Sequence, residues 1–196
     1  MNDKKKNRKQ DILQNLAFML ENELSDRITT AKLAKQVGVS EAALYRHFPS
    51  KARMYESLLD FSEESIFGLI KKIDAEPLKA VEKIYQISHL LLGFSQKNPG
   101  ISRLLTGEVL LGEPLRLKER ISQLFDRLEL ELKQIHRNEA VKEGNSSLNS
   151  AAVAKLVTSI LEGRIQQFVR SKFKILPTEH WDAQWKFIQP SVEQLS

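Results

Sequence analysis

The chain has 196 residues, no cysteine and a formal net charge of +5. This length corresponds to one large domain or two small ones, and the lack of cysteine excludes disulfides and thiolate metal sites. No apolar run approaches the roughly 20 residues of a membrane-spanning helix, and the polar N-terminus lacks the apolar segment of a secretory signal. We therefore expect a cytoplasmic protein without a membrane span.

The positive charge is confined to the first 53 residues. Residues 1–10 contain five basic residues and one acidic residue, residues 11–26 contain four acidic residues, and residues 27–53 contain six basic residues and one acidic residue. Residues 54–196 contain 19 of each sign. A local basic surface is typical of a protein with a polyanionic partner. Residues 1–9 are equally compatible with a solvated charged tail, and we expect them to be a flexible basic tail.

Helical periodicity runs through the chain, and no sustained strand-like alternation interrupts it. After a first helix that ends near Glu23, Thr29 is a favourable N-cap for a short helix that stops at Gly38. Ser40 is the next favourable N-cap, for a helix over Glu41–Phe48 that Pro49 ends. Further helices are predicted from Ser50 to Ile73 and over Leu78–Phe94, Ile101–Leu111, Leu117–Ile135, Ser150–Phe173 and His180–Leu195. The sequence thus predicts an all-α protein.

Two short helices joined by a glycine-containing turn are typical of a helix-turn-helix. Aliphatic residues (Leu33, Ala34, Val37, Val39 and Leu44) are expected to hold the pair together, which leaves the second helix free to lie in the major groove of double-stranded DNA. Its exposed surface would consist of Ser40, Glu41, Ala42, Ala43, Tyr45 and Arg46. Arginine can form two hydrogen bonds with guanine, and alanine can contact the thymine methyl group. Phosphate contacts are expected from Thr29, Thr30, Tyr45, His47 and Lys51.

The segment from Thr29 to Lys51 contains the strings TTAKLA and GVSEAALYRHFPSK. It resembles the DNA-binding motif of the TetR family. The resemblance implies a three-helix N-terminal head, residues 10–53, followed by an all-helical body, residues 54–196. In that family the last two helices pair two subunits, which implies a homodimer.

The resemblance extends into the body, at Leu90–Phe94, Lys97–Gly100, Leu104–Gly107 and Phe168–Lys174. These segments are similar to those of the nucleoid occlusion factors of the TetR family. Such proteins associate with the nucleoid, bind specific chromosomal sites as dimers or higher assemblies, and bind the tubulin-like division protein FtsZ, so that no septum forms over unsegregated DNA. The positions that match their FtsZ-binding surface are Phe61, Leu90, Gly93, Lys97 and Asn98. Leu69 departs from the pattern, because a basic residue is common there.

Other interpretations of these positions stay open on sequence alone. Phe61 and Leu90 would by default be core residues of amphipathic helices, and Lys97 and Asn98 would form a polar C-terminal turn. Gly93 costs about 1 kcal/mol relative to alanine inside a helix. This cost indicates close approach by another helix or by a partner.

We expect no enzymatic activity, metal or cofactor. The four histidines lack metal-ligand spacing, and neither a glycine-rich phosphate loop nor a catalytic cluster is present. Two alternatives to a nucleoid occlusion factor remain. One is a ligand-responsive transcriptional repressor of the same fold, which needs a roomy, mostly apolar pocket in its body. The other is an interaction protein that never contacts bases.

Overall fold

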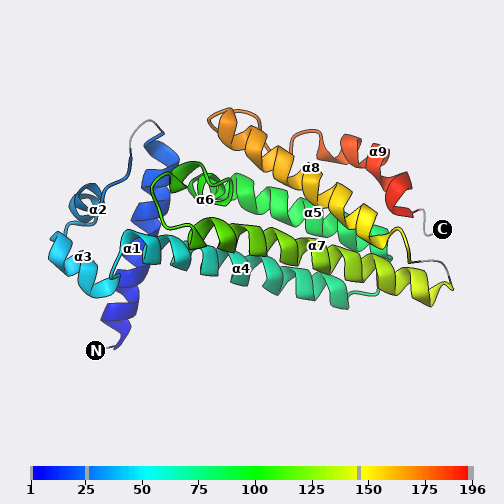
Figure 1. Cartoon of the computed structure of the whole chain (residues 1–196), viewed down its shortest axis with the longest axis horizontal. Coiled ribbons are helices and arrows are strands. Elements are labelled where there is room, and N and C mark those ends of the chain that lie inside the picture. Colours follow the sequence, from blue (N-terminus) through cyan, green and yellow to red (C-terminus); the bar gives the residue numbers. More distant parts are fainter. Residues whose placement is uncertain (1, 25–26, 145–146, 194–196) are drawn as a thin grey trace. The chain divides into compact units, whose positions relative to one another are not determined.

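The structure, a computed structural model, describes residues 2–24, 27–144 and 147–193 (Figure 1). Within these ranges every regular element is a helix, which confirms the all-α prediction. The elements are α1 (Asn2–Asn22), α2 (Thr30–Val37), α3 (Glu41–His47), α4 (Lys51–Ala75), α5 (Ala80–Lys97), α6 (Pro99–Leu105), the short 3₁₀ helix η1 (Glu108–Leu110), α7 (Arg116–Lys142), α8 (Ser150–Arg170) and α9 (Trp181–Glu193). None of the described helices has both the length and the apolar character needed to cross a membrane.

Some helix boundaries differ from the sequence prediction. Residues 2–9, expected as a flexible tail, continue α1, since neither glycine nor proline interrupts Asn2–Asn22. The single helix predicted over Ile101–Leu111 is divided into α6 and η1, because Gly107 adopts a left-handed conformation with φ 73°. Of the last predicted helix, α9 accounts for Trp181–Glu193, and Leu195 lies outside the described residues.

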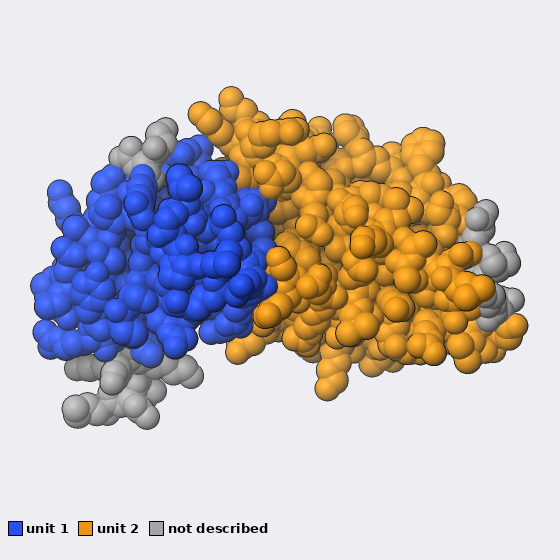
Figure 2. Space-filling view, viewed as in Figure 1, with its two compact units in different colours: residues 1–62, 98–121 blue, residues 63–97, 122–196 orange. Residues whose placement is uncertain are grey.

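The chain folds into two compact units, which Figure 2 colours separately. Unit 1 comprises residues 1–62 and 98–121, and unit 2 comprises residues 63–97 and 122–196. The sequence predicted that, after a basic tail over residues 1–9, a head over residues 10–53 is followed by a body over residues 54–196. The structure instead adds the first part of α4, all of α6 and the start of α7 to the unit that contains α2 and α3.

Unit 1 is held together by close packing of α6 on α1. Gly100 lies so near to α1 that a Cβ atom there would be 2.1 Å from the carbonyl oxygen of Ala17. Arg103 is buried, and its Nη1 donates to the carbonyl oxygens of Leu20, at 2.6 Å, and Glu23, at 3.2 Å. Leu20 lies in the last turn of α1 and Glu23 directly follows the helix, where carbonyls lack an intrahelical partner, so the guanidinium satisfies them and fixes α6 to α1.

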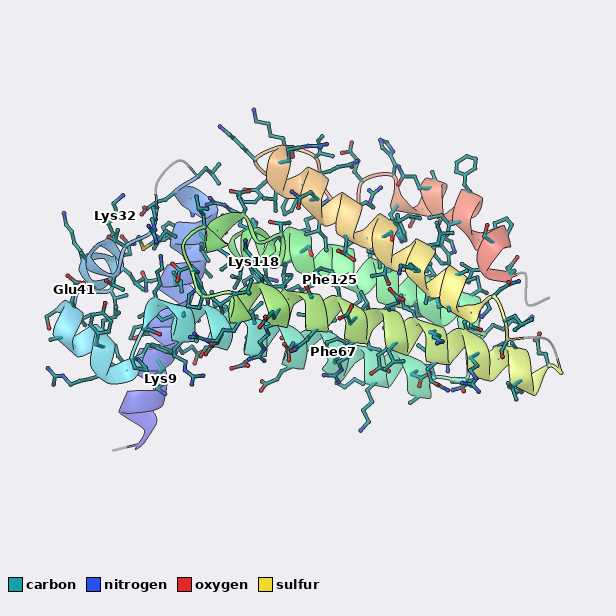
Figure 3. All side chains as sticks on the ribbon, viewed as in Figure 1. Lys9, Lys32, Glu41, Phe67, Lys118 and Phe125 are labelled. Carbon is teal, nitrogen blue, oxygen red and sulfur yellow. The ribbon has the colours of Figure 1, made fainter. Side chains whose placement is uncertain are left out.

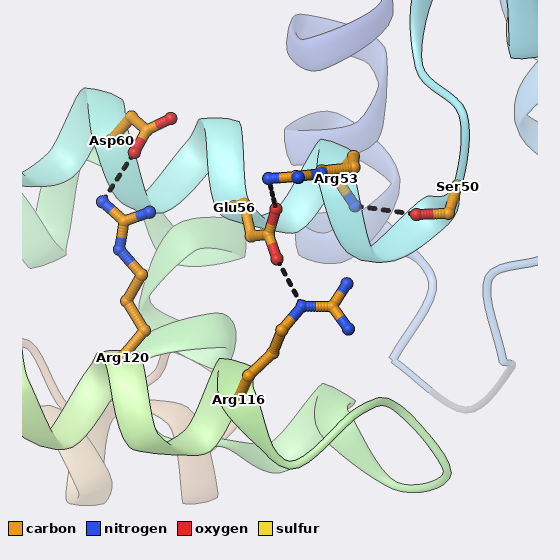
Figure 4. Close-up of polar contacts among 6 residues, drawn as sticks. All are labelled: Ser50, Arg53, Glu56, Asp60, Arg116 and Arg120. Carbon is orange, nitrogen blue, oxygen red and sulfur yellow. Dashed lines mark hydrogen bonds and ion pairs between the residues drawn. The ribbon is translucent and has the colours of Figure 1, made fainter.

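Ion pairs join the first turns of α4 and α7 within unit 1 (Figure 4). The carboxylate of Glu56 accepts from Arg53, at 2.7 Å, and from Arg116, at 2.8 Å, while Arg120 donates to Asp60 at 2.6 Å. Burial alone would raise the pKa of Glu56, but the two arginines outweigh it and lower that pKa. The start of α7 is therefore bound electrostatically to α4.

Unit 2 is a bundle in which α5 packs against α8 and α9. On another face α7 lies beside the second part of α4, where the guanidinium of Arg127 lies 3.8 Å from the ring centroid of Phe67. The core of the bundle is largely apolar, and the ring of His136 is wholly buried in it. Its Nδ1 lies 2.8 Å from Ser150 Oγ and its Nε2 lies 3.0 Å from the carbonyl oxygen of Val192, so this side chain joins α7, α8 and α9.

Candidate nucleic-acid interface

Local capping signals form the helix-turn-helix as the sequence predicts. The Thr29 hydroxyl accepts from the amide of Lys32, and the Ser40 hydroxyl accepts from the amide of Ala43, both at 3.2 Å. Between the two helices Gly38 adopts φ 72°, and its amide bonds back to the end of α2. A residue with a side chain is strained in that conformation, so glycine permits the turn.

A small apolar core fixes the angle between α2 and α3. Leu33, Ala34 and Leu44 are buried, with at most 2% of their surface exposed. Val37 and Val39 flank the turn and are half-buried. Leu33, Ala34 and Leu44 therefore form the core of the helix pair, and the side of α3 that carries Tyr45 and Arg46 is exposed.

The exposed side of α3 carries the residues predicted to face the bases. Ser40, Glu41, Ala42, Tyr45 and Arg46 are exposed, and Ala43 is half-buried. Tyr45 is an aromatic residue with 44% of its surface open to solvent. We call this set, together with Thr29 and Thr30 at the start of α2, the α2–α3 surface.

A chain of hydrogen bonds orders the α2–α3 surface. The Tyr45 hydroxyl donates to Thr30 Oγ1 at 3.2 Å, and the Thr30 hydroxyl donates in turn to Glu41 Oε2 at 2.9 Å. Figure 3 shows Glu41 on the side of α3 that faces α2. Three side chains from two helices are thus held in one network on an exposed face. The sequence placed each of them on the surface but did not indicate that they bond to one another.

Lys51 and His47 lie differently from the other predicted phosphate contacts. The Lys51 side chain is only 15% exposed, and its ammonium lies 2.6 Å from the Glu113 carboxylate and 3.1 Å from the Ile28 carbonyl oxygen. A cation so enclosed has its charge compensated inside the protein. His47 is half-buried in the last turn of α3. The sequence near Glu113 did not indicate this ion pair, because its partner Lys51 lies in a distant segment of the chain.

The residues expected to contact FtsZ are divided between the two units. In unit 1, Phe61 on α4 is 49% exposed and therefore is not a core residue, and Asn98 immediately precedes α6. In unit 2, α5 carries Leu90 and Gly93, both half-buried, and Lys97, which is exposed. A Cβ atom at Gly93 would meet nothing within 4 Å beyond its own helix backbone, so packing against another described helix does not explain this glycine.

Comparisons with known proteins identify the relatives of this chain. Residues 26–58 match the bacterial regulatory proteins of the tetR family, and residues 79–194 match a family described as tetracyclin repressor-like, C-terminal domain, of the SlmA-like type. The nucleoid occlusion factor SlmA of Shewanella pealeana is 54% identical over 189 residues, which cover 96% of both chains. SlmA of Shewanella oneidensis is 53% identical over the same share.

Solved structures share the fold at low sequence identity. A TetR transcription regulator from Haloarcula marismortui superposes with a TM-score of 0.76 at 19% identity, over 97% of this chain and 98% of that one. A TetR transcriptional regulator from Chloroflexus aurantiacus superposes with a TM-score of 0.75 at 17% identity, over 99% and 98%. The predicted TetR-like fold and the resemblance to nucleoid occlusion factors are both confirmed.

Proposed function

This chain belongs to the SlmA nucleoid occlusion factors of the TetR family, and from that premise we propose that it binds a specific DNA sequence through α2 and α3 and, when so bound, captures FtsZ through residues of α4 and α5. The mechanism is the presentation of a protein-binding surface at chosen chromosomal sites, so that a septum does not assemble over them. No chemical step by the chain's own residues is required.

The α2–α3 surface carries the DNA part of the proposal. Its exposed arginine, hydroxyl groups and alanines are the side chains that read base edges in the major groove, and Thr29 lies at a helix N-terminus that favours a phosphate. Lys51 is better explained as a structural cation than as a phosphate contact. The contacts we propose are therefore Thr29, Thr30, Ser40, Glu41, Ala42, Ala43, Tyr45 and Arg46, with His47 at the margin.

DNA binding is tested with a duplex that the full chain itself selects from a randomised pool. Fluorescence anisotropy against this duplex and a scrambled one gives the specificity ratio, which for sequence-specific proteins is about 10³ or more. The alternative of an interaction protein that never contacts bases predicts equal affinity for the two duplexes and no effect of Tyr45→Ala.

Exposure and open space support the FtsZ part of the proposal. Phe61 exposes half of a large aromatic surface, which is a typical anchor of a protein interface. Gly93 leaves a shallow position on α5 that a partner backbone can approach closely, and the Lys97 cation follows one turn later. The apolar anchor on α4 suits an apolar group of a partner, and the glycine and cation on α5 suit an acidic one.

The decisive experiment is co-sedimentation of the full chain with FtsZ polymers, with and without the selected duplex. We expect capture in the presence of the duplex and its loss in Phe61→Ala and Lys97→Glu. Phe18→Ala is a matched control, because Phe18 on α1 is similarly exposed, at 55%, and we expect it to retain capture. If FtsZ fails to co-sediment both with and without the duplex, the FtsZ proposal is wrong.

We also propose that two copies pair through α8 and α9. Within unit 2, Arg164 of α8 joins the two helices, because its Nη1 donates to Gln184 Oε1 of α9 and its Nε donates to the Pro177 carbonyl oxygen before α9, at 2.7 Å. They expose Leu156, at 44%, and Phe187, at 83%, and a Cβ at Gly163 on α8 would meet no atom within 4 Å. Sedimentation equilibrium should give a dimer that Phe187→Asp dissociates, whereas Leu130→Asp on α7, 61% exposed, should leave it intact.

The ligand-responsive repressor is not favoured, because the curated relatives at 54% and 53% identity are named nucleoid occlusion factors. The grooves in the body do not discriminate between a ligand-responsive repressor and a nucleoid occlusion factor. Unit 2 has a groove of about 390 Å³ beside Leu78, Tyr85 and Trp185, and another of about 530 Å³ beside Pro77 and Ile135. A body without pockets would have been independent support for nucleoid occlusion, but unit 2 contains these two grooves.

A further inference from the structure

Unit 1 contains a cavity of about 500 Å³ that none of the functions above uses. We call it the head cavity. Its walls come from the end of α1, the segment before α2, the first two turns of α4, α6 and the η1 segment. All of these belong to unit 1. A volume of this size is within the range of about 300–1,000 Å³ that is usual for small-molecule sites.

One part of the head cavity is aliphatic. Leu20 and Ile28 form a buried wall, and Leu24 and Val109 continue it with half-buried side chains. Leu111 lies at the rim with 86% of its surface exposed. A leucine so exposed beside an aliphatic wall gains burial if an apolar chain enters, at roughly 25 cal/mol per Å² of surface removed from water.

The other part of the cavity is cationic. Arg103 is buried and bonds to Glu108 at 2.8 Å, and Lys51 bonds to Glu113 at 2.6 Å. Arg27 is held loosely by comparison, since its guanidinium lies 3.9 Å from Glu113 and its side chain is 68% exposed. These five described groups, three cations and two carboxylates, have a net charge of +1. Arg27 is the cation that is least compensated by a carboxylate.

Tyr55 adds a neutral donor to this part of the wall. Its side chain is buried, and burial together with the nearby Glu113 carboxylate raises its pKa to about 12. The phenol therefore keeps its proton at any physiological pH, and it can donate a hydrogen bond to an anion but cannot repel one.

We propose that the head cavity is a binding site for a small amphiphilic monoanion, a carboxylate with a short aliphatic chain. The carboxylate would form charge-assisted hydrogen bonds with the Arg27 guanidinium, and the chain would lie against Leu20, Leu24 and Ile28. A single unbalanced positive charge suits a monoanion better than a dianion such as a phosphate monoester. The site shares no residue with the α2–α3 surface or with the grooves of unit 2. This proposal can therefore be tested independently of the DNA and FtsZ proposals.

The test is isothermal titration calorimetry of the full chain with octanoate, beside a thermal melt. We expect saturable binding at about one octanoate per chain with a dissociation constant of about 1 mM or tighter, and a rise in melting temperature with octanoate concentration. Octanol, which lacks the charge, and acetate, which lacks the chain, should each bind about tenfold more weakly. Octanol binding as tightly as octanoate would overturn the assignment of an anion site.

Three variants locate the binding. Val109→Phe fills the cavity, and Arg27→Gln removes the loosely paired cation. We expect each to weaken octanoate binding by about tenfold or more. Arg53→Gln is the matched control, because Arg53 is 64% exposed and pairs with Glu56 outside the cavity, and it should change binding by less than about twofold. The proposal is overturned if octanoate shows no saturable binding, or if a folded Val109→Phe binds it as the unaltered chain does.

Discussion

The ammonium of Lys51 lies 2.6 Å from the Glu113 carboxylate, so that the first residue of α4 is bound to the segment that precedes α7. The same ammonium lies 3.1 Å from the carbonyl oxygen of Ile28, just before α2. One cation thus connects three segments of unit 1. Glu113 is only 8% exposed, and without Lys51 its charge would retain, among the described residues, only the longer contact with Arg27, at 3.9 Å.

Lys51→Met should therefore destabilise the protein rather than act on DNA directly. We expect a loss of about 2–3 kcal/mol in the free energy of unfolding, because the variant leaves a largely buried carboxylate without its main partner. Urea denaturation measures it. The double variant Lys51→Met, Glu113→Gln should recover part of the loss. An unchanged urea midpoint in Lys51→Met would show that the pair contributes little.

Arg46 and Thr29 should affect DNA binding in different ways. Arg46→Ala should cost about 1–3 kcal/mol on the selected duplex and little on a scrambled one, because an arginine that reads a base distinguishes sequences. Thr29→Ala should weaken both duplexes alike, since phosphate contacts carry no sequence information. Anisotropy titrations with both duplexes measure the difference. If Arg46→Ala weakens binding to the selected and scrambled duplexes equally, Arg46 contacts the DNA phosphate backbone instead of a base.

Gly100→Ala should be among the most damaging single substitutions in unit 1. The added Cβ would lie 2.1 Å from the Ala17 carbonyl oxygen and 3.0 Å from the Glu21 amide, so α6 would have to move away from α1. Overpacking of this kind costs about 1–3 kcal/mol or more. Gly68→Ala is the control, because this exposed glycine of α4 has nothing within 4 Å of its Cβ position, and alanine there should raise the melting temperature.

Stability should fall as the pH falls below about 6.5, and His136 should account for part of the loss. Burial lowers the pKa of His136 from its ordinary value of 6.5, although the bond to Val192 opposes the shift. The ring is therefore neutral in the folded chain at a pH where the unfolded chain already binds a proton. Its contribution is complete above the unfolded pKa and is lost as the pH falls through it toward the folded value.

Urea denaturation at pH 7.5 and pH 5.5 tests this. The measured quantity is the change in the free energy of unfolding between the two pH values, compared between the unaltered chain and His136→Gln. The difference removes the background from Glu162, whose pKa is raised by burial and by the nearby acids Asp126 and Glu129. If the free energy of unfolding changes with pH in His136→Gln as it does in the unaltered chain, His136 does not account for the pH dependence.

The helix-turn-helix could be predicted in detail from sequence because its determinants are local. Thr29 and Ser40 cap the helices that immediately follow them, and Gly38 supplies the left-handed residue between them. The body helices follow from apolar periodicity in the same way. Each of these signals acts within a few residues of the structure that it specifies.

The remaining features depend on residues that are distant in the chain. Nothing near Gly100 indicates that α1 lies against it, and nothing near Lys51 indicates Glu113. For this reason the sequence assigned α6 to the body and Lys51 to the DNA surface. The hydrogen bonds from Tyr45 through Thr30 to Glu41 join two helices across the turn, and their formation depends on the angle at which α2 and α3 pack.

That network has a consequence for the kinetics of DNA recognition. Exposed tyrosine, threonine and glutamate side chains ordinarily sample several rotamers, and ordering each of them on association costs roughly 0.5–1.5 kcal/mol. Because Tyr45, Thr30 and Glu41 restrain one another before DNA arrives, much of this entropy is lost during folding instead. With the DNA contacts proposed above, the encounter with DNA would then begin from a single prepared arrangement of these three groups, which would favour rapid rejection of mismatched sites during a search along the chromosome.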